Sequence, residues 1–118
     1  MKRLLFHLRQ APHGRSVGQD ALEAILAASV FEPPMTVLLE GEGVLQLLGE
    51  QDPTPLGSRD IGANWSALPV FEVDDVQVHG PSLERFGLVA ADLLLPVTVV
   101  DDAGMARLIA GSDQVLCF

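Results

Sequence analysis

The sequence predicts an α/β fold, a doubly wound and mostly parallel sheet of about five strands with helices on both faces. Two observations support this. Short apolar or β-branched runs alternate with segments of helical spacing along the whole 118-residue chain. Neither a long internal repeat nor a convincing linker interrupts the alternation. We therefore expect a single domain spanning residues 1–118, a length that is ordinary for one domain.

The first third of the chain predicts two strands around a helix. Residues 2–9 carry the apolar run Leu-Leu-Phe, which is typical of a buried first strand. Residues 11–14, Ala-Pro-His-Gly, are typical of a turn. Ser16 can cap a helix whose apolar positions recur at helical spacing as far as residue 28. Pro33-Pro34 ends that helix, and residues 35–39 form the second expected strand.

The rest of the chain continues the alternation, with shorter elements. Glycine and proline separate them, and Asp101 or Asp102 can cap the last helix. The expected elements are a short helix over 44–48, a loop over 49–58, a helix over 59–68 that Gly62 weakens, strand-like residues at 70–73 and 76–78, a short helix over 81–86, a strand over 97–100, a helix to about residue 110 and a last strand over 115–118.

The composition is acidic and rich in apolar residues. Seven basic and 16 acidic residues give a formal charge of −9, which disfavours direct binding to nucleic-acid phosphates. Hydrophobic residues make up 48% of the chain and charged residues only 19%. Two explanations fit equally well: a well-filled core with short loops, or an apolar surface buried against another subunit.

Several features indicate a soluble, cytoplasmic protein. The apolar start at Leu4 is broken by His7 and Arg9, so it does not resemble a signal peptide. No apolar run approaches the length of a membrane-spanning helix. One cysteine cannot form a disulfide within the chain, which suits a reducing compartment.

Motifs for nucleotides, metals and serine nucleophiles are absent. The chain holds no GxGxxG, no P-loop and no GxSxG. Its three histidines, His7, His13 and His79, lack the spacing of metal ligands. We therefore expect no cofactor and no metal.

Two histidines and a tryptophan are the candidate binding residues. His13 lies in the loop after the first strand, and His79 lies between a strand and the helix that begins near Pro81. Loops at the carboxyl ends of parallel strands are where ligands bind in such folds. A small-molecule or anion-binding module is therefore one hypothesis, although ordinary structural roles are favoured for both histidines. Trp65 could anchor an interface or fill the core.

Cys117 is the one candidate nucleophile, and its sequence neighbours argue against that role. Reactive cysteines lie near positive charge or a helix start. Cys117 instead lies in an apolar strand next to the C-terminal carboxylate, and Asp113 is the nearest charged side chain in sequence. We expect an inert residue at a strand end.

Several segments together resemble the TusC/DsrF subunits of DsrE-like sulfur-relay complexes. The Ala-Pro-His-Gly turn with the following helix resembles their APHG…LDALLA-S pattern, and residues 43–48, GVLQLL, resemble their GVFQLL segment. Arg59-Asp60 matches the RD start of their third helix, and Ser82–Arg85 with Gly87-Leu88 is similar to SLRERGL. The ending DQVLCF resembles their DVILRF tail.

The resemblance implies a DsrE-like fold and a place in a heterohexamer with TusB-like and TusD-like subunits. Such a complex accepts persulfide sulfur from TusA and passes it to TusE for 2-thiolation of the tRNA wobble uridine. The alternatives are a DsrF-type subunit of a DsrEFH complex in dissimilatory sulfur oxidation and a stand-alone sulfurtransferase that uses Cys117. Contact with nucleic acid or membrane is not implied.

The resemblance also bears on single residues. The acceptor cysteine of the family belongs to the D subunit, after a central strand, and in this sequence His79 takes the matching position. Imidazole cannot form a persulfide. The family tail has arginine where this chain has Cys117. The resemblance therefore implies a non-catalytic subunit with no catalytic residue of its own. Pro12, His13 and Gly14 remain a candidate pocket or interface loop.

Overall fold

A computed structural model describes residues 2–10, 17–31, 33–48, 65 and 68–118. It contains a five-stranded sheet in the order β4-β3-β2-β1-β5, and every neighbouring pair is parallel. The strands are β1 Leu4–Leu8, β2 Met35–Leu39, β3 Val76–His79, β4 Thr98–Val100 and β5 Gln114–Cys117. The α-helices are α1 Val17–Ser29, α3 Gly80–Arg85 and α4 Asp102–Gly111, and the 3-10 helices are η1 Gly41–Leu47, η2 Leu68–Phe71 and η3 Ala90–Asp92.

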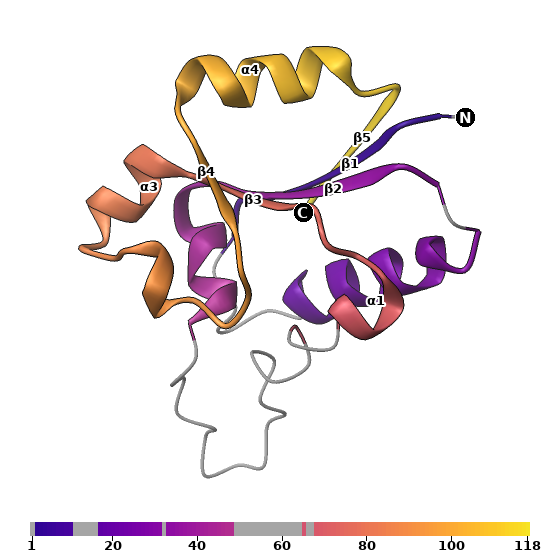
Figure 1. Cartoon of the computed structure of the whole chain (residues 1–118), viewed down its shortest axis with the longest axis horizontal. Helices are drawn as coiled ribbons and strands as arrows, with labels where there is room; N and C mark the ends of the chain where they lie inside the picture. The colour runs from indigo at the N-terminus through magenta and orange to yellow at the C-terminus, as the bar shows by residue number, and fades with distance from the viewer. Residues whose placement is uncertain (1, 11–16, 32, 49–64, 66–67) are drawn as a thin grey trace, which may run out of the picture.

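Helices lie on both faces of this sheet (Figure 1). Helix α1 lies on one face and α4 on the opposite face. This arrangement confirms the predicted fold class, a parallel α/β sheet covered on both sides.

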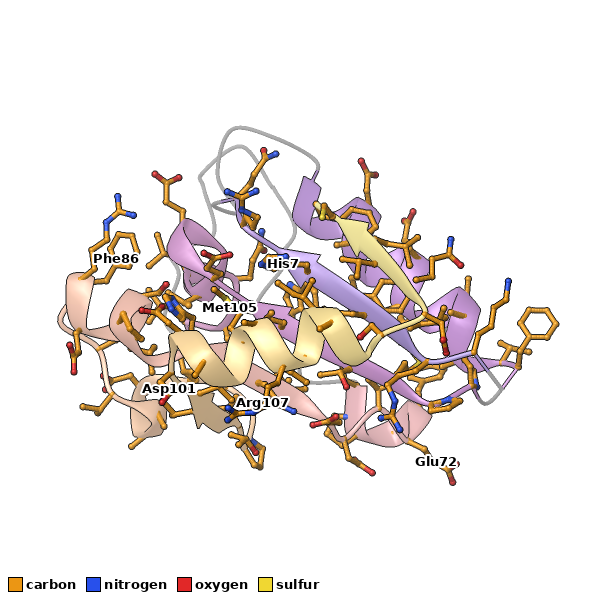
Figure 2. All side chains as sticks on the ribbon, turned by 90° about the horizontal axis from the view of Figure 1, so that it is seen from above. His7, Glu72, Phe86, Asp101, Met105 and Arg107 are labelled. Carbon is orange, nitrogen blue, oxygen red and sulfur yellow. The ribbon has the colours of Figure 1, made fainter. Side chains whose placement is uncertain are left out.

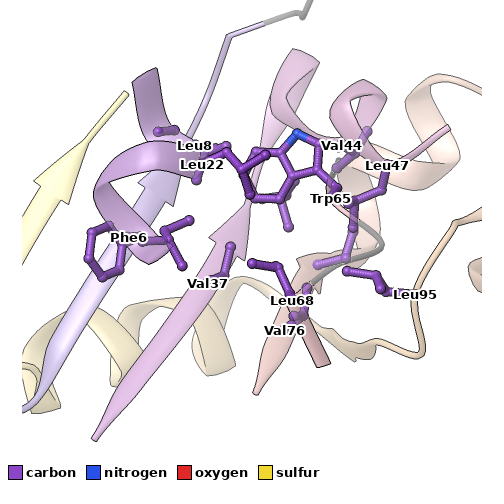
Figure 3. Close-up of a cluster of buried hydrophobic side chains, with 14 of the residues drawn as sticks. Phe6, Leu8, Leu22, Val37, Val44, Leu47, Trp65, Leu68, Val76 and Leu95 are labelled. Atoms are coloured by element: carbon purple, nitrogen blue, oxygen red, sulfur yellow. The ribbon is translucent and has the colours of Figure 1, made fainter. Parts of the chain in front are cut away.

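The main core lies between the sheet and α1 (Figure 3). Strand residues in register, such as Phe6 beside Val37, point to this face and pack with Leu22 and Ile25 of α1. Trp65 is fully buried in the same cluster. It is therefore a core residue, which decides between the two roles that the sequence left open for it.

The opposite face is thinly covered. Leu5 and Leu38 are fully buried there, but α4 buries none of its own residues. The largely apolar sequences of β1 and β2, which are interrupted only by His7 and Thr36, follow from this two-sided burial.

One close approach fixes η1 against the carboxyl end of β1. A Cβ added at Gly43 would lie 2.1 Å from the carbonyl oxygen of Leu8. The Leu8 carbonyl also accepts a hydrogen bond from the backbone N–H of Glu40 at 2.9 Å. Only glycine allows this contact without moving backbone.

Two predicted elements differ in the structure. Residues 70–73 are not a strand, because Leu68–Phe71 form the 3-10 helix η2 and Glu72 has a positive φ of 63°. Pro69 has no N–H for a sheet ladder, which favours a turn here. The short helix expected over 44–48 is the 3-10 helix η1, which starts three residues earlier. The expected loop 49–58, and residues 59–64 and 66–67 of the helix expected over 59–68, lie outside the described residues.

Candidate functional site at the carboxyl edge of the sheet

His79 is the centre of a hydrogen-bonded cluster at the carboxyl edge of the sheet. It is the last residue of β3, and it is 8% exposed. Its Nδ1 lies 2.6 Å from Ser82 Oγ on α3, and its Nε2 lies 2.6 Å from Asp102 Oδ1 at the start of α4. Ser82 Oγ also accepts the N–H of Gly41 in η1 at 2.7 Å. Together these residues are the His79 cluster.

The bonding pattern assigns the proton positions in the neutral imidazole. Because Ser82 Oγ accepts from Gly41, its own hydrogen is free to donate to Nδ1 of His79. Nε2 then carries the ring hydrogen and donates it to the Asp102 carboxylate. Each ring nitrogen has a partner, so the cluster ties the ends of β3, α3, η1 and α4 to one side chain.

Serine, histidine and aspartate are also the residue types of hydrolytic triads, but the placement differs. Ser82 is 5% exposed, and its hydroxyl is held by two partners. The neighbouring open groove of about 530 Å³ is lined by residues that do not include Ser82 or His79, namely Gly80, Pro81, Glu84, Val99, Val100, Asp101, Gly104 and Arg107. A nucleophile needs access to its substrate, so the geometry favours a positioning role for this cluster.

The sequence offered either Asp101 or Asp102 as the cap of the last helix, and in the structure only Asp101 has that role. Asp101 is the N-cap of α4, since its Oδ1 accepts the N–H of Gly104 at 2.7 Å. Figure 2 shows Asp101 at this end of α4, with Arg107 further along the helix. Asp102 begins the helix and binds His79. Sequence reasoning missed this pairing, although the carboxyl ends of neighbouring parallel strands meet at one edge.

A second polar group on the same sheet face surrounds His7 (Figure 2). His7 Nε2 lies 2.7 Å from Glu40 Oε1, and Arg9 Nε lies 3.8 Å from the same oxygen. His7 pairs in register with Cys117 of β5, so both side chains point to the same side of the sheet.

The strand-end position predicted for Cys117 is confirmed. The residues that lie near it in space, however, differ from its neighbours in the sequence. Cys117 is exposed, and it shares a cavity of about 560 Å³ with Arg9, Gln10, Asp20 and Phe118. The imidazole of His7 lies on β1, the strand beside β5, and the cation of Arg9 follows the end of β1. The inertness of this thiol stays a prediction, which the Cys117→Ser variant described below tests.

The remaining candidate residues are placed as follows. Pro12, His13 and Gly14 lie outside the described residues. Within the described part of the chain, no group of three or more His, Cys, Asp or Glu side chains could hold a metal ion. Nor does that part contain a helix of the length and apolarity that a membrane span requires.

Comparison with known proteins gives a consistent result over the full chain. The profile of the DsrE/DsrF-like family matches residues 2–118. A protein named TusC homolog from Vibrio vulnificus is 34% identical over 118 residues, which is 100% of both chains. A second TusC homolog, from Pseudomonas aeruginosa, is 38% identical over 113 residues, covering 96% of this chain and 95% of its own.

Two solved structures share the fold at lower identity. The ychN protein from E. coli superimposes with a TM-score of 0.84 at 20% identity, over 100% of both chains. A protein of unknown function from Methanobacterium thermoautotrophicum superimposes with a TM-score of 0.71 at 17% identity, again over 100% of both chains. With its parallel sheet, its end-to-end profile match and its TusC homologs, the chain belongs to the DsrE/DsrF-like family.

Proposed function

We propose that this chain is a TusC-like, non-catalytic subunit of a TusBCD-type sulfur-relay complex. Such a complex passes persulfide sulfur from TusA to TusE for 2-thiolation of the tRNA wobble uridine. The chain acts as one domain over residues 1–118, in the cytoplasm, beside TusB-like and TusD-like subunits. The observation that supports the proposal is that β3 ends in His79, at the position that the resemblance matches to the acceptor cysteine of a partner subunit.

The chemistry of sulfur relay explains why this position matters. An acceptor thiolate attacks the outer sulfur of the donor persulfide, a new S–S bond forms, the old S–S bond breaks, and the donor leaves as a thiolate. No external oxidant is needed, but the acceptor must be a sulfur atom. His79 has none, and both of its nitrogens are already bonded to Ser82 and Asp102. The position therefore supports structure here, and sulfur transfer is left to a partner.

His79→Ala is expected to lower the free energy of unfolding by about 1–3 kcal/mol, because it leaves the buried Ser82 hydroxyl without its acceptor. Chemical denaturation monitored by circular dichroism measures this. Asp102→Asn is the matched control and should cost less, since an amide oxygen still accepts from Nε2. An unchanged unfolding midpoint for His79→Ala would show that the cluster does not hold these elements together.

Cys117→Ser is expected to leave both assembly and sulfur transfer by the reconstituted complex unchanged. The side chain is exposed, and serine is nearly the same size, so folding should not be affected. Transfer of radiolabelled sulfane sulfur through the purified complex is the readout. If transfer collapses while the complex stays intact, Cys117 is a sulfur carrier.

That outcome would favour a second candidate function, a sulfurtransferase acting through Cys117. The observation in its favour is the exposed thiol beside His7 and near Arg9. Reactive cysteines are partly exposed and lie near positive charge. The acceptor position of the family is elsewhere, at His79, so the structural role is the stronger proposal.

A further inference from the structure

The amino-terminal edge of the sheet, opposite the His79 cluster, carries unusual exposed apolar side chains. Val30 and Phe31 follow α1 and are 74% and 81% exposed. Val70 and Phe71 in η2 are 80% and 47% exposed. The first pair lies between α1 and β2, and the second lies before β3; β2 and β3 are neighbours in the sheet, and α1 contacts η2. These four residues are called the amino-edge patch below.

The η2 half of this patch is held rigidly. Leu68 and Val73, on either side of the exposed pair, are buried in the core, and the N–H of Val73 donates to the carbonyl of Leu68 at 3.0 Å. Val70 and Phe71 therefore project from a fixed turn. A preformed apolar projection loses little conformational entropy on binding, which suits it for recognition.

The following residues anchor that turn to β2. The buried Thr36 donates its hydroxyl to Asp75 Oδ2 at 2.6 Å, and the N–H of Val37 donates to the Asp75 carbonyl at 2.9 Å. Between the projection and this anchor, Glu72 adopts a left-handed backbone that is costly for a residue with a side chain. The folded chain therefore keeps this turn although the backbone conformation of Glu72 is unfavourable.

The other half of the patch includes a hollow. An apolar pocket of about 280 Å³ lies beside Phe31, lined by Lys2, Leu4, Ala28, Phe31 and Pro33. The hollow can receive an apolar side chain from a partner, and the exposed phenyl ring of Phe31 beside it can pack against that side chain. Pockets of this kind are where interface anchors bind.

The charged residues around the amino-edge patch indicate the kind of partner that it binds. Glu72 and Asp74 are exposed at the rim of the patch, and within the described residues neither forms an ion pair. Lys2 lines the hollow of this patch, but two copies meeting through the patch would still bring together chains that each carry a formal charge of −9. A different protein with Lys or Arg around an apolar centre has no such conflict.

We propose that the amino-edge patch is the docking surface for a different subunit, one with an apolar centre and a basic rim. This inference rests on the proposed function, in which the chain works inside a complex of unlike subunits. Docking at this edge leaves the opposite, carboxyl edge with His79 free to face the sulfur-relay site.

The test is co-expression of the full-length chain with the TusB-like and TusD-like subunits, followed by native mass measurement and a dissociation constant for each variant. The double variant Phe31→Asp, Val70→Asp is expected to weaken assembly by at least about tenfold, as loss of buried apolar anchors does. Glu72→Lys should weaken it more at low salt than at high salt, because it reverses a charge that faces a basic rim. Both substituted apolar side chains are largely exposed, so the isolated variants should unfold at the wild-type midpoint.

Val89→Asp is the matched control. Val89 is 61% exposed and lies three residues after Phe86, which Figure 2 shows at the other end of the molecule from Glu72. It should leave assembly unchanged. If the double variant assembles as tightly as the wild-type chain, the amino-edge patch is not the docking surface, and the proposed function is unaffected. A wild-type chain that binds neither subunit would overturn the proposed function, and this docking assignment with it.

Discussion

Gly43→Ala is expected to destabilise the protein by about 3 kcal/mol or more, a large part of the total stability of an ordinary domain. The new methyl group would lie 2.1 Å from the Leu8 carbonyl oxygen and 2.6 Å from its carbon. Both atoms are backbone of a central strand, so they cannot rotate away as a side-chain end would. Either η1 or the carboxyl end of β1 must move.

The consequence extends to the candidate site. The N–H of Gly41, two residues earlier in η1, donates to Ser82 of the His79 cluster. Displacement of η1 should therefore loosen that cluster together with the core. This makes Gly43 a sensitive test of whether η1 and the carboxyl edge are organised as described.

Urea denaturation of Gly43→Ala beside Gly111→Ala gives the comparison. Gly111 is the last residue of α4, and an added Cβ there has no heavy atom within 4 Å. Alanine at that position is expected to be neutral or to stabilise by up to about 1 kcal/mol. If both variants unfold at the wild-type midpoint, the close packing of Gly43 on β1 is wrong.

Trp65→Ala is expected to cost about 3–5 kcal/mol, the range for deleting a large buried aromatic side chain. Trp65 is fully buried, and Figure 3 shows its ring among Leu22, Val44 and Leu47. The remaining cavity cannot be filled by neighbours that already pack against the sheet.

Trp65→Phe is the informative companion. It keeps a ring in the core and removes Nε1, a buried donor that has no hydrogen-bond partner among the residues that the structure describes. We expect it to cost clearly less than the alanine variant. Thermal unfolding of the isolated chain measures both. A cost below about 1 kcal/mol for Trp65→Ala would be typical of an exposed interface residue and would contradict its place in the core.

The sheet could be predicted from sequence because its strands are short, buried and separated by turn residues. Met35–Leu39 is one apolar run between Pro34 and the glycines of η1, and such a run has few alternatives. Val70 and Phe71 were wrongly assigned to a strand because the same kind of local pattern can have a different cause. They are apolar and β-prone, but the structure exposes them in η2, and an exposed apolar pair gives the same local pattern as a buried one.

The candidate site was only partly predictable. His79 could be placed at a strand end, but its partners Ser82 and Asp102 come from separate elements. Ser82 is only three residues from His79, but pairing His79 with Asp102 requires knowing that β4 lies beside β3, which no local pattern states. Cys117 gives the same lesson, since its sequence neighbours suggest acidic surroundings while the sheet places His7 beside it.

Co-expression with TusB-like and TusD-like subunits, followed by mass measurement under native conditions, tests the central claim most directly. The proposed function predicts a stable heterohexamer that contains this chain and both partners. A stable, soluble monomer that binds neither subunit would contradict the proposal.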